Sequence, residues 1–228
     1  MFCLFAYSQL SEECNNLEIV IIDNPAPHLE KIKTFMDETL EKHGHAPLGV
    51  GWRSRENQFL RFDQFRRIFE GREEPFSLND LGCGLGGLYE WATEYQLPIS
   101  RYVGYDISER MVADARGLHK SDNVHFVQSP TLMEVADFSI ACGIFNTRLD
   151  ESEEAWSEYM REVVRNLAEK SSLGFAFNSL TTYVDWREPH LFYADPIEWF
   201  DWCKKDISPR VALLHDTPLY EWTMIVRL

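Results

Sequence analysis

Residues 78–89 read LNDLGCGLGGLY, and this stretch decides the fold. Gly82, Gly84 and Gly87 have G-x-G-x-x-G spacing, after a short apolar run and before a helical pattern. Glycines at a strand-to-helix turn let the backbone approach a ligand closely. The spacing therefore predicts a binding loop for a dinucleotide or for another molecule that contains adenosine.

Asp80, two residues before the first glycine, distinguishes between these two candidate ligands. A dinucleotide places its pyrophosphate at the helix start, and a carboxylate there repels it. S-adenosylmethionine has no phosphate, and its ammonium group is attracted to a carboxylate. Asp106, about twenty residues after the loop, can accept hydrogen bonds from both ribose hydroxyls of either cofactor. The sequence therefore favours S-adenosylmethionine over a nicotinamide cofactor.

From residue 76 onward, short apolar runs alternate with amphipathic stretches, which predicts an α/β fold with a mainly parallel sheet. The last two apolar runs are joined by a short turn and must therefore be antiparallel. Strands are predicted over 76–82, 101–106, 123–128, 136–143, 172–178, 210–216 and 220–228, and helices over 85–95, 108–117, 150–170 and 195–205.

The first 75 residues are predicted to form a helical segment that covers the cofactor site of a domain at 76–228. Its helices are expected within 24–44 and 54–71. Phe59, Phe62, Phe65 and Phe69 recur at near-helical spacing, which predicts a face packed on the core. On the other side of that helix, Gln58 and Arg61 are predicted to reach the cofactor and pair with its carboxylate, and a surface salt bridge is the alternative.

The motifs NDLGCGLGG, YVGYDIS, HFVQSP and ADFSIACGIFN resemble the successive cofactor-binding motifs of class I S-adenosylmethionine-dependent methyltransferases. The resemblance implies a Rossmann-like sheet of seven strands in the order 3-2-1-4-5-7-6, with the last strand antiparallel. It implies that Asp80 holds the methionine portion, Asp106 the ribose, and Ile107 and Met111 the adenine. The cofactor residues expected in this way are Asp80, Gly82, Cys83, Gly84, Gly86, Asp106, Ile107, Met111, Gln128, Ser129, Gly143 and Phe145.

Methyl transfer from a sulfonium needs in-line positioning, and a base only for a hydroxyl or a protonated amine. The long stretch 179–196 offers an acceptor pocket, with His190 as the candidate base or substrate anchor. A surface loop whose aromatic side chains cap the core is the alternative. The predicted substrate-binding residues are Asn146, Tyr183, Trp186 and Tyr193.

The acceptor is predicted to be a small molecule methylated on oxygen or nitrogen. The stretches GWRSRENQFLRF and TTYVDWREPHLFYADP resemble uncharacterised methyltransferases of bacterial saccharide or small-metabolite pathways, which makes a saccharide or its conjugate a candidate. A net charge of −15 and the absence of an N-P-P-Y motif after the fourth predicted strand argue against nucleic acid.

No metal site is predicted, because the histidines are scattered and the fifth predicted strand does not end in an acid. His28 is expected to face solvent at a helix start. Five cysteines without a C-x-x-C pair indicate a reducing compartment, the cytoplasm. The apolar opening residues are too short to cross a membrane. The sequence leaves open the oligomeric state and the order of the first twenty residues.

Two other functions are kept as alternatives to the enzyme. The first is a module that binds S-adenosylmethionine without catalysis. The second is an oxidoreductase dependent on a nicotinamide cofactor, since G-x-G-x-x-G by itself suits both ligands.

Overall fold

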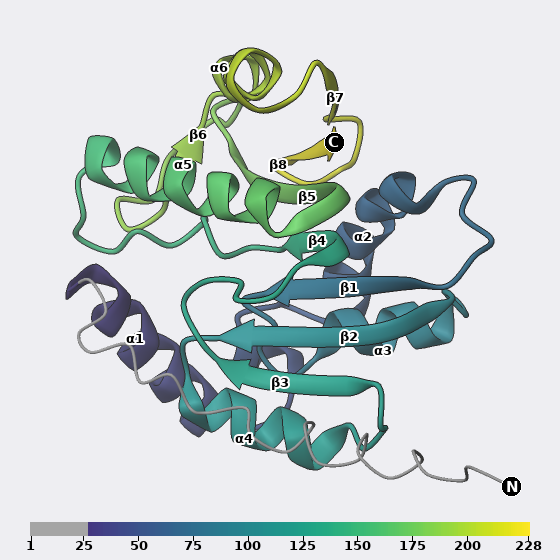
Figure 1. The fold of residues 1–228 in the computed structure, drawn as a ribbon. Coiled ribbons are helices and arrows are strands. Elements are labelled where there is room, and N and C mark those ends of the chain that lie inside the picture. Colours follow the sequence, from purple (N-terminus) through teal and green to yellow (C-terminus); the bar gives the residue numbers. More distant parts are fainter. Residues whose placement is uncertain (1–26) are drawn as a thin grey trace, which may run out of the picture.

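A computed structural model describes residues 27–228, and the opening residues whose order the sequence left open lie outside this range. A twisted sheet forms the middle layer, with helices on both faces (Figure 1). One core lies between the sheet and α2, α3 and α4, and the other between the sheet and α5 and α6. The chain therefore has the three-layer α/β architecture that the sequence predicts.

The sheet has the order β3-β2-β1-β4-β5-β8-β7, and a two-residue strand, β6, also pairs with β5. Without β6, this is the predicted seven-stranded order, which is confirmed. Only β8 runs antiparallel to its neighbours β5 and β7. The strands are β1 Phe76–Leu81, β2 Ile99–Asp106, β3 Val124–Gln128, β4 Ala136–Ala141, β5 Ser171–Thr181, β6 Tyr193–Ala194, β7 Arg210–Leu214 and β8 Glu221–Arg227.

Serine and aspartate caps begin several of the helices. The Ser108 side chain accepts a hydrogen bond from the Met111 amide, and Asp195 accepts from Ile197 and Glu198. The helix predicted from residue 85 begins later, because Gly86 adopts a left-handed conformation before it. The α-helices are α1 Pro27–His43, α2 Arg55–Phe65, α3 Gly87–Glu94, α4 Glu109–Leu118, α5 Glu153–Glu169 and α6 Pro196–Trp202; short turns η1 Pro47–Val50, η2 Arg66–Phe69 and η3 Cys203–Ile207 accompany them.

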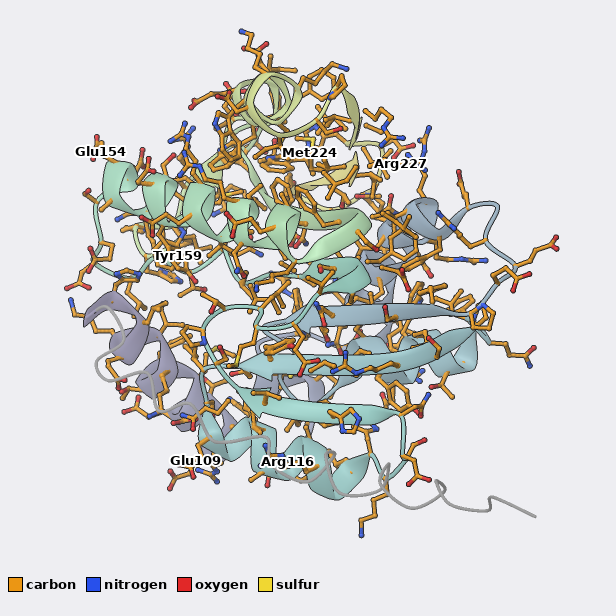
Figure 2. All side chains as sticks on the ribbon, viewed as in Figure 1. Glu109, Arg116, Glu154, Tyr159, Met224 and Arg227 are labelled. Atoms are coloured by element: carbon orange, nitrogen blue, oxygen red, sulfur yellow. The ribbon has the colours of Figure 1, made fainter. Side chains whose placement is uncertain are left out.

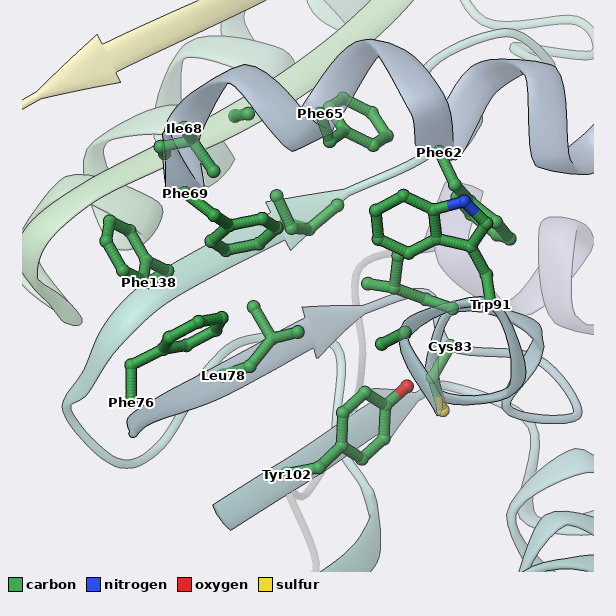
Figure 3. Close-up of a cluster of buried hydrophobic side chains, with 14 of the residues drawn as sticks. Phe62, Phe65, Ile68, Phe69, Phe76, Leu78, Cys83, Trp91, Tyr102 and Phe138 are labelled. Atoms are coloured by element: carbon green, nitrogen blue, oxygen red, sulfur yellow. The ribbon is translucent and has the colours of Figure 1, made fainter. Parts of the chain in front are cut away.

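The phenylalanine row of α2 and η2 packs on the sheet, as its spacing predicts (Figure 3). Phe59, Phe62, Phe65 and Phe69 are all buried. Phe69 stacks on Phe76 of β1, with ring centroids 4.8 Å apart. This contact attaches the segment before residue 75 to the central strand, whose carboxyl end bears the glycine turn.

Helix α1 crosses the carboxyl edge of the sheet from the start of α5 to α4 (Figure 1). Lys31 forms an ion pair with Asp150 just before α5, and Glu41 pairs with Arg110 of α4. In the middle of α1, Asp37 accepts a hydrogen bond from the Ser108 hydroxyl. These contacts place α1 over the strand ends where parallel sheets bind ligands.

Candidate active site

A cavity of about 150 Å³ lies between α1 and the carboxyl edge of the sheet. The glycine turn after β1 and Asp106 at the end of β2 form part of its wall. The turn after β4 and helices α1 and α5 form another part, and residues of η1, α2, α3, α4 and the turn after β3 complete it. The cavity therefore lies on both sides of β1, because the sheet places β2 and β4 next to that strand.

Asp80, near the end of β1, is a buried carboxylate in this wall, with only 3% of the residue exposed. Tyr102 of β2 donates a hydrogen bond from its hydroxyl to Oδ2 of Asp80 at 2.5 Å. Burial raises the pKa of Asp80 to about 7, and the charge of Asp106 adds to this, against the opposing effect of the Tyr102 hydrogen bond. A bound cation would favour the ionised form of Asp80.

Asp106 connects the glycine turn to the start of α4. Its Oδ2 accepts a hydrogen bond from the Gly84 amide at 2.9 Å, and its Oδ1 accepts one from the Ser108 amide at 2.9 Å. Burial raises its pKa above the ordinary value. Each oxygen has lone-pair capacity for a further donor, so the carboxylate is oriented and still able to bind hydroxyl groups.

The turn between β1 and α3 requires glycine at its first position. Gly82 has φ +75°, and a Cβ atom there would lie 2.1 Å from Cγ2 of Ile144. Below the turn, the His119 ring donates from Nε2 to the Leu85 carbonyl at 2.8 Å. The turn is thus a close-packed backbone cradle held by a histidine that sequence reasoning did not single out.

Comparison with known proteins shows the family to which this chain belongs. The model of a methyltransferase domain (Methyltransf_25) matches residues 79–170, which contain the glycine turn. A putative methyltransferase of Mycobacterium tuberculosis, Rv1506c, is 41% identical over 157 residues, which are 68% of this chain and 94% of that protein. The chain belongs to the class I S-adenosylmethionine-dependent methyltransferases.

Solved structures share the fold of this methyltransferase. Magnesium protoporphyrin IX methyltransferase (ChlM) from Synechocystis PCC 6803 with bound SAM superposes with a TM-score of 0.60 at 14% identity, over 90% of this chain and 99% of the other. The DhpI-SAM-HEP complex superposes with a TM-score of 0.62 at 17% identity, over 90% of this chain and 100% of the other. At such identities the likeness concerns the fold.

Most of the predicted cofactor residues of the methyltransferase come together in the cavity. Gln58 joins them from α2, although the sequence places it far from the glycine turn. The predicted residues that line the cavity are Gln58, Asp80, Gly82, Cys83, Gly84, Asp106, Ile107, Met111, Ser129 and Gly143.

Four other predicted residues lie elsewhere. Arg61 forms a buried ion pair with Glu221 and does not reach the cavity wall. Gln128 is exposed and donates from its amide to the Ile107 carbonyl at 3.3 Å. Phe145 packs in the core, and Gly86 precedes the first turn of α3.

The predicted acceptor residues do not line the cavity of the methyltransferase. The loop 179–196, which contains all of them except Asn146, folds against the segment after β4, because the His190 carbonyl accepts from the Arg148 and Leu149 amides. Tyr183, Trp186 and His190 are exposed. The Asn146 side chain accepts from the Leu180 amide, and the Tyr193 hydroxyl accepts from the Glu188 amide.

Sequence reasoning missed the side chains of α1 and α5 that form the outer wall. Leu29, Ile32 and Met36 line the cavity from α1, and Trp156 and Tyr159 line it from α5. The spacing i, i+3, i+7 in α1 was a signal for one buried face, but it did not show what that face covers. Val50 and Trp52, which lie between α1 and α2, also line the cavity.

The expectation that His28 faces solvent is wrong. Its ring lies edge-on to Tyr159, with centroids 5.0 Å apart, and to Trp156 at 5.9 Å. Its Nε2 is buried and has no hydrogen-bond partner among the described residues. The first turn of α1 packs on α5, and this packing buries Nε2 while the residue as a whole stays half-buried.

Between residues 27 and 228, no three His, Cys, Asp or Glu side chains form a group able to hold a metal ion. In the same range, no helix has the length and apolar character needed to span a membrane.

Proposed function

We propose that this protein transfers a methyl group from S-adenosylmethionine to an oxygen or nitrogen atom of a small-molecule acceptor. The strongest support is that one cavity wall contains both a glycine turn and two buried carboxylates, Asp80 and Asp106. No Lys, Arg or His of residues 27–228 lines that cavity. Such a wall attracts an ammonium group and repels a pyrophosphate.

The residues fit the cofactor by burial and by shape. A carboxylate whose pKa is raised by burial becomes favourable in its ionised form beside a cation, and Asp80 is such a group. Asp106 is oriented by two backbone amides and accepts the ribose hydroxyls. Ile107 and Met111 supply apolar surface for the adenine ring. The cradle at Gly82 has no room for a side chain.

The cofactor, when bound, supplies an activated methyl group. The protein then has to hold the acceptor in line with it and exclude water. Helix α1 serves the second task, since Leu29, Ile32 and Met36 close the cavity on its solvent side. His190 stays a prediction as the base for a hydroxyl acceptor; replacing it by Ala and finding turnover unchanged would remove it from the mechanism.

Calorimetry with S-adenosylhomocysteine and NADH tests the cofactor. We expect S-adenosylhomocysteine to bind and NADH to give no heat. Asp106→Ala should lower the affinity for S-adenosylhomocysteine. Asp122→Asn is the matched control, because Asp122 is exposed and lies before β3, at the opposite edge of the sheet. Tight NADH binding without S-adenosylhomocysteine binding would overturn the proposal.

Turnover separates an enzyme from a binding module. Incubation with S-adenosylmethionine and a fractionated metabolite extract should release S-adenosylhomocysteine, and isotopic labelling of the methyl group should identify the acceptor. A saccharide acceptor stays a prediction, and the labelled product tests it directly. Binding of the cofactor with no release in any fraction would favour the non-catalytic alternative.

A further inference from the structure

One part of the cavity lies away from Asp80 and Asp106 and is lined by other residues. It lies on the β4 side of β1, where Ile144 and Thr147 follow β4 in the chain. Trp156 and Tyr159 of α5 and Ile32 of α1 enclose it. Figure 2 labels Tyr159 between α5 and α1. We name this part, bounded by these five residues, the α1–α5 subsite.

The α5 wall of the α1–α5 subsite is aromatic and fixed in position. Trp156 donates from Nε1 to the Phe145 carbonyl at 2.8 Å, which sets the orientation of the indole. Tyr159 lies beside it, with ring centroids 5.0 Å apart and planes at 47°. His28 contacts both rings edge-on. A preorganised aromatic wall binds a flat apolar group with little loss of side-chain freedom.

The charges around the α1–α5 subsite disfavour an anion. The nearby cations are engaged elsewhere: Lys31 with Asp150, and Arg61 with Glu221. Arg148 donates to the Leu191 and Glu151 carbonyls. The charged side chains that do line the cavity are the carboxylates Asp80 and Asp106. A phosphate or carboxylate group entering here would lose hydration without gaining a partner.

We propose that the acceptor is an uncharged molecule that binds through a flat apolar face, such as an aromatic ring, in the α1–α5 subsite. This inference rests on the proposed function, because it assigns the rest of the cavity to the cofactor. It names the substrate class: the nucleophilic oxygen or nitrogen is attached to a neutral group that stacks on Trp156 or Tyr159. Acceptors that carry an anionic group on the part bound in the α1–α5 subsite are excluded.

The test uses the full chain loaded with S-adenosylhomocysteine and a matched pair of probes, methyl 4-hydroxybenzoate and 4-hydroxybenzoate. Calorimetry should show the neutral ester binding at least about tenfold more tightly than the acid, since the cavity leaves a carboxylate unpaired. Tyr159→Leu should weaken the ester about fivefold and leave S-adenosylhomocysteine affinity unchanged. Phe35→Leu is the control, because Phe35 is an exposed aromatic residue of α1 outside the cavity.

A second variant reverses the preference. Ile32→Lys places a cation in the subsite and should raise the affinity of the acid relative to the ester, which Tyr159→Leu should not do. Equal binding of the two probes to the unaltered protein, binding of neither, or tighter binding of methyl α-glucoside that Tyr159→Leu does not change would each overturn the inference. Failure of S-adenosylhomocysteine itself to bind would instead refute the proposed function.

Discussion

The guanidinium of Arg61 on α2 forms a buried ion pair with the carboxylate of Glu221 at the start of β8. The two side chains are 11% and 5% exposed, and Arg61 Nε lies 3.0 and 2.9 Å from the two carboxylate oxygens. Glu221 also accepts from the Asn178 amide at 2.7 Å, and Asn178 accepts from the Gly143 amide at 2.7 Å. The pair thus connects α2 to the turn after β4 that borders the cavity.

Glu221→Ala should strongly destabilise the protein. It leaves the Arg61 guanidinium buried without its partner, a change that typically costs about 3–5 kcal/mol of the free energy of unfolding. Denaturant unfolding measures the loss. Lys31→Ala is the matched control, because it breaks an exposed pair and should leave the midpoint nearly unchanged. Similar midpoints for the two variants would show that the buried pair contributes nothing special.

Removing both charges should keep cofactor binding. In the double variant Arg61→Met, Glu221→Gln, no unpaired charge stays buried, so we expect it to be more stable than Glu221→Ala. Because Arg61 does not line the cavity, S-adenosylhomocysteine should bind the double variant within about threefold of the unaltered protein. Loss of binding in a folded double variant would restore the sequence-based prediction that Arg61 pairs with the cofactor carboxylate.

Asp80 should make the unliganded protein less stable as the pH rises. Its pKa is about 7 in the folded state against an ordinary 3.8, so between these values the folded state binds more protons than the unfolded state. Stability from this group is therefore complete below about pH 4 and is lost as the pH rises towards 7. Asp80→Asn should raise the melting temperature of the empty protein at pH 8 more than at pH 5.

The same carboxylate should control cofactor affinity in the opposite direction. Only ionised Asp80 attracts the ammonium group. The affinity for S-adenosylhomocysteine should therefore fall below pH 7 by up to about tenfold per pH unit. Asp80→Asn should bind weakly at all pH values, with a flat profile between pH 5 and 8. Calorimetry across this range measures both profiles; identical slopes for the two proteins would exclude Asp80 as the cause.

Gly82→Ala should abolish cofactor binding while Gly117→Ala should not. A Cβ at residue 82 meets Ile144 and also forces an alanine into φ +75°. Gly117 lies in α4 with open space around it, and alanine there should stabilise the helix by about 0.5–1 kcal/mol. Thermal melts with and without S-adenosylhomocysteine separate the two effects. A normal ligand-induced shift in Gly82→Ala would contradict the cradle.

The sequence by itself determined the sheet, the glycine turn and the carboxylates at the ends of β1 and β2. These features depend on neighbours in the chain: apolar runs, capping residues and glycines at a strand-to-helix turn all act over a few residues. Because parallel strands align their carboxyl ends, Asp80 and Asp106 meet once the strand order is known. Motif resemblance supplied that order before the structure did.

Only the tertiary structure decided which parts of the protein Arg61, His28 and the stretch 179–196 contact. Arg61 and Glu221 are 160 residues apart in the sequence, and the pairing depends on α2 packing beside β8. The predicted acceptor loop instead bonds to the segment after β4, and α1 and α5 supply the outer wall of the cavity. Helical periodicity shows that a face is buried, but the partner of that face follows from the packing of whole elements.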